Sequence, residues 1–157
     1  MHEETLVRHL GYPPEIAWDF LADLRHDPLW RREIVRSDLV GGAAREAGAE
    51  YRELVLWEGI NAEVLITTPE LQRGVLLSVH VHEPGYESTY TYEFTPAVDG
   101  CEVRLRMCID TMGPLRLIEP FMWAIITRWI EQSLAGLDDV IAAHLDQGEA
   151  LPNVGHV

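Results

Sequence analysis

The chain has 157 residues, of which 47% are hydrophobic and 24% are charged, so it can build one hydrophobic core of ordinary size. This composition excludes wholesale disorder, and the longest nearly apolar run, residues 121–126, is too short for a transmembrane helix. The 26 acidic and 12 basic residues leave a formal net charge of -14, which disfavours nucleic acids and anionic membranes as partners.

Residue types that are missing or scarce exclude further classes of reaction and a disulfide. All 12 basic residues are arginines, which excludes a lysine Schiff base and a phosphate-binding lysine. Cys101 and Cys108 are expected on one strand, too far apart for a mutual disulfide, and lone thiols suit a reducing compartment. Residues 1–4 have neither the basic nor the apolar region of a signal peptide. We therefore expect a cytoplasmic protein.

The first third of the chain predicts one strand followed by two short helices. Residues 4–10 have the pattern of a strand, and the prolines at 13 and 14 favour a turn and a helix start. Residues 15–24 carry apolar side chains at helical spacing. His26-Asp27-Pro28 ends this helix, and residues 29–34 can form a second short one.

The middle of the chain predicts an antiparallel meander, because alternating runs are separated by turn residues such as Pro84-Gly85 and Asp99-Gly100. The strands are expected at 34–40, 49–57, 60–68, 74–82, 87–95 and 101–110. A long helix is predicted over 115–146, with an apolar stripe that includes Met122, Trp129 and Ile141. We expect one domain, residues 1–147, and a flexible tail, residues 148–157.

Local motifs match a known family along nearly the whole chain. They are Tyr12-Pro13-Pro14-Glu15-Ile16-Ala17-Trp18, Asp23, Trp30, Tyr92-Glu93-Phe94-Thr95-Pro96, Asp99-Gly100, Gly113-Pro114 and Pro120. With the element order, they resemble the START-like and birch-pollen-allergen-like superfamily called SRPBCC, and within it the polyketide cyclase/dehydratase-like branch. The motifs are typical of the fold, and none is a catalytic signature.

This resemblance implies an α+β helix-grip fold, in which a curved seven-stranded antiparallel sheet wraps around the long C-terminal helix. Two short helices stand between strands 1 and 2. It also implies a deep cavity between sheet and helix that holds a hydrophobic or polycyclic small molecule. The aromatic-ring cyclases of this branch usually carry an arginine late in the strand that here ends in Thr67-Thr68-Pro69, which weakens a direct transfer of their mechanism.

Hairpin turns predict which side chains point into this cavity, because residues paired across antiparallel strands share a face. A two-residue turn at Pro84-Gly85 pairs Leu77 with Tyr92 and Val79 with Tyr90. The turn at Asp99-Gly100 adds Leu105 and Met107 to the same face. The expected concave set is Val75, Leu77, Val79, Val81, Tyr90, Tyr92, Phe94, Val103, Leu105, Met107 and Ile109.

One carboxylate is expected among these apolar neighbours. A turn at Glu58-Gly59 pairs Glu53 with Val64 and Tyr51 with Ile66, so Glu53 points inward. If it is enclosed, desolvation raises its pKa and suits it for general acid or base catalysis. Alternatively, the sheet edge lets Glu53 reach solvent or an arginine, or a bulge turns it to the other face.

Aromatic and apolar side chains around the same volume are candidates for ligand binding, since flat rings with polar edges suit a planar ligand. Tyr90 and Tyr92 join Glu53 as catalytic candidates, because their hydroxyls can hydrogen-bond a ligand carbonyl or enol. The alternative is that the rings are packed core. The ligand-binding candidates are Tyr51, Trp57, Val64, Leu77, Val79, Met107, Met122, Trp123 and Trp129.

His80 and His82 form a His-x-His pair on one side of a strand. Strand parity places them on the convex face beside Glu87 and Thr89, which favours a solvated pair over a metal site. A turn longer by one residue would move them into the cavity as acid/base candidates. No phosphate loop, dinucleotide fingerprint or nucleophile elbow is present, so we expect no cofactor and no metal.

Three functions stay open. The first is a cofactor-free polyketide cyclase/dehydratase-like enzyme that confines a reactive intermediate while Glu53 or a tyrosine moves protons. The second is a non-catalytic protein that carries, senses or sequesters a lipid, quinone, pigment or toxic metabolite. The third is an interaction protein that docks a partner through its acidic exterior. We expect a monomer or homodimer with a hydrophobic small-molecule partner, without nucleic-acid binding or membrane insertion.

Overall fold

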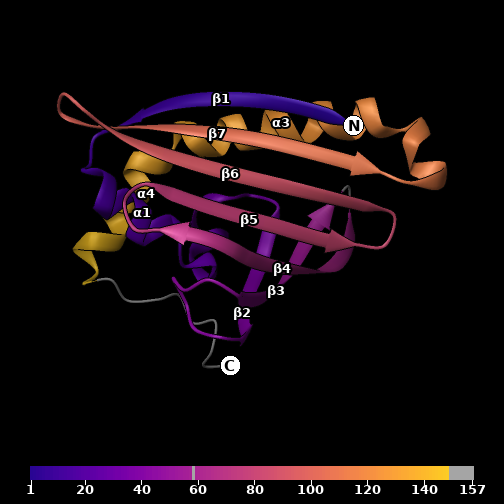
Figure 1. The fold of residues 1–157 in the computed structure, drawn as a ribbon, viewed down its shortest axis with the longest axis horizontal. Coiled ribbons are helices and arrows are strands. Elements are labelled where there is room, and N and C mark those ends of the chain that lie inside the picture. Colours follow the sequence, from indigo (N-terminus) through magenta and orange to yellow (C-terminus); the bar gives the residue numbers. More distant parts are fainter. Residues whose placement is uncertain (58, 149–157) are drawn as a thin grey trace.

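The computed structural model describes residues 1–57 and 59–148. Seven antiparallel strands form one sheet, and their order across it is β1-β7-β6-β5-β4-β3-β2 (Figure 1). The strands are β1 (His2–Leu10), β2 (Ile34–Gly41), β3 (Ala49–Trp57), β4 (Ile60–Gln72), β5 (Leu76–Glu83), β6 (Tyr86–Ala97) and β7 (Gly100–Thr111).

Helices connect the first two strands and complete the C-terminal part of the chain. Figure 1 shows α3 running behind the sheet near β1 and β7, with α1 and α4 at the other end of the molecule. The helices are α1 (Pro14–Leu21), the 3-10 turn η1 (Leu24–His26), α2 (Asp27–Trp30), the 3-10 turn η2 (Gly113–Leu117), α3 (Glu119–Ala135) and α4 (Leu137–Asp146).

The predicted strand register is confirmed at each hairpin. Tyr92 pairs with Leu77 on one side and Leu105 on the other, and Glu53 pairs with Val64. Because side chains alternate along a strand, this register buries one face of every central strand. The resulting core includes Leu77, Val79, Val81, Tyr90, Tyr92, Phe94, Val103, Leu105 and Met107.

One member of the predicted concave set is misplaced. Val75 is 46% exposed because it lies in the turn before β5, which begins at Leu76. Strand β4 is also longer than expected and continues through Pro69 to Gln72. A register shift against β5 between Thr67 and Glu70 accommodates the proline, which has no N–H to give to a sheet ladder.

The predicted C-terminal helix over 115–146 is interrupted. Residues 113–117 form η2, and the α-helix begins at Glu119. At Gly136 the backbone leaves helical geometry, with φ -98° and ψ 0°, and α4 follows. Glycine has a low helix propensity because it loses the most backbone freedom in a helix. The break places Leu137 and Ile141 in the core, both completely buried.

The sheet and the helices are joined by a few polar contacts. The indole N–H of Trp18 in α1 donates to the carbonyl of Leu76 at 2.8 Å, and the Gly11 N–H donates to Asp138 at 3.0 Å. Of the expected flexible tail, residues 148–157, only Gly148 belongs to the described residues. Glu58 of the predicted turn also lies outside them. Within the described part of the chain, no helix has both the length and the apolar character that crossing a bilayer requires.

Candidate functional site

A cavity with two adjoining chambers lies between the concave face of the sheet and α3. The inner chamber has a volume of about 60 Å³, and the outer chamber has one of about 270 Å³. Five residues line both chambers and therefore mark where they meet. These are Val55, Trp57, Val64, Tyr86 and Ile126.

The two chambers differ in polarity. The outer chamber is lined mainly by apolar side chains from the β3-β4 hairpin, η2 and the start of α3, including Ile60, Leu115 and Met122. The inner chamber adds a polar end, formed by Arg31, Glu33, Glu53 and Ser88. The cavity can thus accept an apolar body and present charged and hydrogen-bonding groups to one end of it.

Glu53 is the most unusual residue of the polar end, because it is 0% exposed and lines the inner chamber. Asp27 and Ser37 are its polar neighbours, although neither of its carboxyl oxygens makes a hydrogen bond of regular geometry among the described residues. The register shifts in this part of the sheet lie between β2 and β3. Strands β3 and β4 pair without a shift, so no bulge in that hairpin turns Glu53 to the other face. The inward orientation predicted for Glu53 is therefore confirmed.

Burial raises the pKa of Glu53 well above its ordinary value, and the charge of Asp27 raises it further. Burial also raises the pKa of Asp27, while Arg31 opposes this rise. Two neighbouring buried carboxyls resist ionising together. We therefore treat Asp27 and Glu53 as a pair in which Glu53 keeps its proton to the higher pH.

Arg31 is a nearly buried cation beside this pair. Its Nε donates to Glu33 Oε1 at 2.7 Å, and its guanidinium carbon lies 5.5 Å from the centre of the Tyr90 ring. Burial alone would lower the pKa of Arg31, but the charge of Glu33 and the neighbouring tyrosines keep it well above its ordinary value. The inner chamber therefore contains a permanent positive charge.

Aromatic rings form the wall between the polar end and the outer chamber. Trp57 and Trp129 meet edge to face, with ring centres 5.1 Å apart at 66°, and the Arg32 guanidinium carbon lies 5.7 Å from the centre of the Trp129 ring. Burial raises the pKa of Tyr86 above its ordinary value, so its hydroxyl stays protonated at neutral pH and can donate a hydrogen bond.

The structure brings some of the predicted site residues together. Glu53, Tyr90, Trp57, Val64 and Trp129 line the inner chamber, and Val64 and Trp57 also reach the outer one. Met122 lines the outer chamber. These residues come from β3, β4, β6 and α3, so the cavity is assembled from segments far apart in sequence.

Other predicted site residues pack elsewhere, as far as the described residues define the two chambers. Tyr92 is buried in the core, where burial raises its pKa above the ordinary value. Tyr51 is completely buried near Asp23, and burial raises its pKa to about 12. Trp123 is half-buried against the ring of His2, with centres 5.6 Å apart. The remaining core positions are Leu77, Val79 and Met107.

Sequence patterns did not predict Asp27, Arg31 and Glu33 as site residues. Asp27 stands in the helix-breaking His26-Asp27-Pro28, and the Arg-Arg-Glu run that follows is typical of a solvated surface. The available signal was spacing: in an extended stretch Arg31 and Glu33 fall on the same side of the chain. Nothing local indicated that this side would face the cavity.

The architecture matches solved structures of helix-grip proteins. A START superfamily protein from Mycobacterium smegmatis has a TM-score of 0.76 at 11% identity, covering 91% of this chain and 99% of that chain. Ara h 8.0201 has a TM-score of 0.70 at 11% identity, covering 90% and 98%. The di-domain ARO/CYC BexL, from the BE-7585A biosynthetic pathway, has a TM-score of 0.73 at 17% identity, covering 92% of this chain and 48% of that one.

At identities this low, the similarities show the fold alone. They confirm the predicted curved sheet around a long C-terminal helix. The family follows from the sequence itself: residues 1–142 match the family described as polyketide cyclase / dehydrase and lipid transport. The chain belongs to that family, and its resemblance to START-like proteins is confirmed. No curated protein matches the chain at a significant level.

Proposed function

We propose that the cavity binds a polycyclic or polyketide-like small molecule and that Glu53 performs cyclase/dehydratase-like acid-base chemistry on it. The observation that carries this proposal is a completely buried carboxyl, with the carboxyl of Asp27 and the hydroxyl of Ser37 as its polar neighbours, at the polar end of an otherwise apolar cavity. A carboxyl in this setting has no cationic partner bonded to it among the described residues, and its pKa is moved towards neutrality. The family supports hydrophobic ligand binding.

Dehydration of a β-hydroxy ketone illustrates the chemistry that this site supports. In the fraction of molecules in which Glu53 is ionised, it removes the proton α to the carbonyl, and the electron pair forms an enolate whose negative charge Arg31 stabilises. Glu53 then returns its proton to the β-hydroxyl, which leaves as water while the carbon–carbon double bond forms. Glu53 is ionised again at the end, and the step is redox-neutral.

Arg31 supplies the cation of this proposal, although the arginine that the family resemblance led us to expect in β4 is absent. Threonines replace the arginine expected late in β4, but Arg31 reaches the inner chamber from the end of α2. A guanidinium and a protonated carboxyl on one chamber can bind a ligand carbonyl from two sides. The polar end would then orient the ligand and the outer chamber would hold its rings.

A non-catalytic binding protein is the second candidate. The apolar outer chamber favours it, because such a lining suits the carriage or sequestration of a lipid, quinone, pigment or toxic metabolite. On this alternative, the polar end only recognises one ligand carbonyl. For either function we infer a cytoplasmic monomer or homodimer, consistent with the acidic composition.

The experiment that separates these functions measures binding and conversion independently. Planar polyketides and quinones are titrated against the wild-type protein and Glu53→Gln, with tryptophan fluorescence for binding and chromatography with mass spectrometry for conversion. Glu50→Gln is the matched control, because Glu50 lies on the same strand but is exposed.

We expect both variants to bind as the wild type does, with conversion lost only in Glu53→Gln. A ligand that is bound and recovered unchanged from all three proteins would support the carrier. Absence of binding by every compound, in the presence of a folded protein, would favour the interaction protein and overturn the proposal.

A further inference from the structure

His80 and His82 lie on the convex face of the sheet, on the side of β5 opposite the cavity wall. Their strand neighbours Val79 and Val81 are buried, whereas both histidines are partly exposed. The two imidazole rings face each other, with centres 4.2 Å apart and planes inclined by 34°. The convex placement expected from strand parity is confirmed, and the rings converge instead of pointing apart into solvent.

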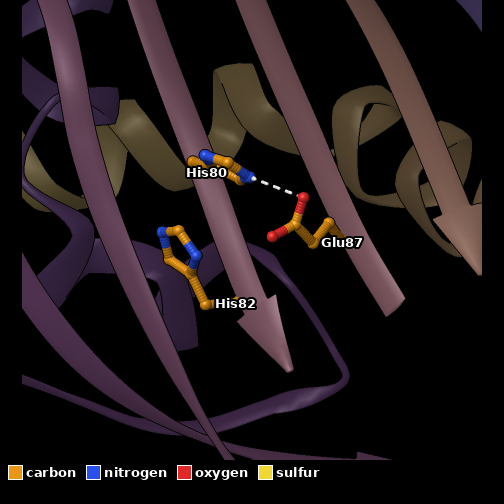
Figure 2. A group of neighbouring side chains, drawn as sticks. All are labelled: His80, His82 and Glu87. Carbon is orange, nitrogen blue, oxygen red and sulfur yellow. Dashed lines mark ion pairs between the residues drawn. The ribbon is translucent and has the colours of Figure 1, made fainter. Parts of the chain in front are cut away.

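A carboxylate from the neighbouring strand completes a group of three. Glu87 of β6 pairs with His82 across the sheet, and its Oε2 lies 3.9 Å from His80 Nε2. Figure 2 shows the two rings on β5 and the Glu87 carboxylate turned towards them from β6. One donor atom from each of the three residues lies within 4.8 Å of the other two.

These separations are close to those of a bound metal ion. Zinc–nitrogen and zinc–oxygen bonds of about 2.0–2.2 Å at tetrahedral angles place two ligand atoms about 3.3 Å apart. Rotation of these partly exposed side chains therefore has to bring the donor atoms closer by up to about 1.5 Å to close the site. Two imidazole nitrogens and one carboxylate oxygen are a donor set typical of Zn²⁺, Cu²⁺ and Ni²⁺.

The surroundings support a cation at this point. The exposed Asp110 of β7 pairs with Glu87 of β6, and the whole chain has a net charge of -14. The electrostatic field at this point therefore favours positive ions. The Thr67 hydroxyl lies 3.2 Å from His82 Nε2 and can hold that ring in place, as outer contacts do around metal-binding histidines.

We propose that His80, His82 and Glu87 form a binding site for a divalent transition-metal ion such as Zn²⁺, with the remaining coordination positions open to water. The sequence pattern alone favoured a solvated histidine pair. The convergence of both rings and the Glu87 carboxylate is the tertiary observation that supports a metal instead. The site lies across the sheet from the cavity and is independent of the function proposed for Glu53.

The test titrates Zn²⁺ into untagged, chelator-treated protein by calorimetry and by competition with a chromophoric chelator. His82→Ala and Glu87→Gln remove ligands, and His9→Ala, an exposed histidine on β1, is the matched control. We expect one equivalent of Zn²⁺ to bind the wild type and His9→Ala. The affinity should fall at least about tenfold in each ligand variant.

A second measurement needs no substitution. Long-range ¹H–¹⁵N spectra of the wild-type imidazoles should show two histidines changing on addition of one equivalent of Zn²⁺, and the His82→Ala spectrum identifies them. A wild type that binds no Zn²⁺, or binding that is unchanged in His82→Ala, would overturn the proposal. Changes confined to other histidines would do the same.

Discussion

Replacing Glu53 by glutamine should change how the stability of the protein depends on pH. Burial and the charge of Asp27 hold the pKa of Glu53 well above its ordinary value of 4.5. Above pH 4.5 the unfolded chain therefore releases this proton while the folded protein retains it. The folded state binds more protons, so the free energy of unfolding falls as pH rises from 4.5 to the pKa of Glu53 in the folded protein.

The size of the effect follows from the same linkage. One proton retained only by the folded protein changes the free energy of unfolding by about 1.4 kcal/mol per pH unit. Glutamine has nearly the shape of a protonated glutamate but does not titrate. Relative to wild type, Glu53→Gln should therefore gain about 1.4 kcal/mol for every pH unit over which Glu53 keeps its proton.

The assay is urea denaturation at pH 4 to 8, followed by tryptophan fluorescence. Wild type and Glu53→Gln should have similar stability at pH 4 and should diverge as pH increases, with the variant the more stable. Glu50→Gln, on the exposed side of the same strand, should run parallel to wild type. Parallel curves for wild type and Glu53→Gln would refute the reasoning, because they would mean that Glu53 is ionised in the folded protein.

Three further predictions concern other parts of the structure. The pKa of Glu119 is lowered to about 2, chiefly by the hydrogen bond from Thr111. This carboxylate therefore stabilises the fold above pH 4.5 and ceases to do so as pH falls through 2. Glu119→Gln should raise the midpoint pH of acid unfolding measured by circular dichroism. Gly100→Ala should destabilise the protein by more than about 3 kcal/mol in urea, because a Cβ there would lie 1.9 Å from the Leu10 carbonyl oxygen at φ 153°. Ile126→Trp should obstruct the junction of the two chambers, which Ile126 lines from both sides. It should weaken binding of a planar quinone at least about tenfold in fluorescence titrations, while the melting temperature changes little; unchanged affinity would place the ligand elsewhere.

Strand alternation was sufficient to predict which face of the sheet is buried, but not which of its residues line the cavity. The side-chain period of a strand is two, so each hairpin turn determines the face of every residue paired through it. This is why the inward orientation of Glu53 and the convex position of His80 could be predicted. Val75 was misplaced because the alternation does not show at which residue a strand begins.

The polar end of the cavity depended on contacts that have no local pattern. Arg31 lies between a four-residue helix and a strand, and its charge is expected at the surface until the folded sheet supplies Tyr90 and Tyr92 as neighbours. The same is true of Asp27, whose position beside Glu53 brings together segments 26 residues apart.

The sequence by itself therefore determined the order of the elements, the register of the sheet and the apolar face that becomes the cavity, because these follow from short-range periodicity and turn residues. Only the tertiary structure decided which charged groups meet there, how large each chamber is, and that the imidazoles of His80 and His82 converge with Glu87. Those properties depend on distances between segments that are remote in the chain. Packing determines these distances, and local sequence patterns do not predict them.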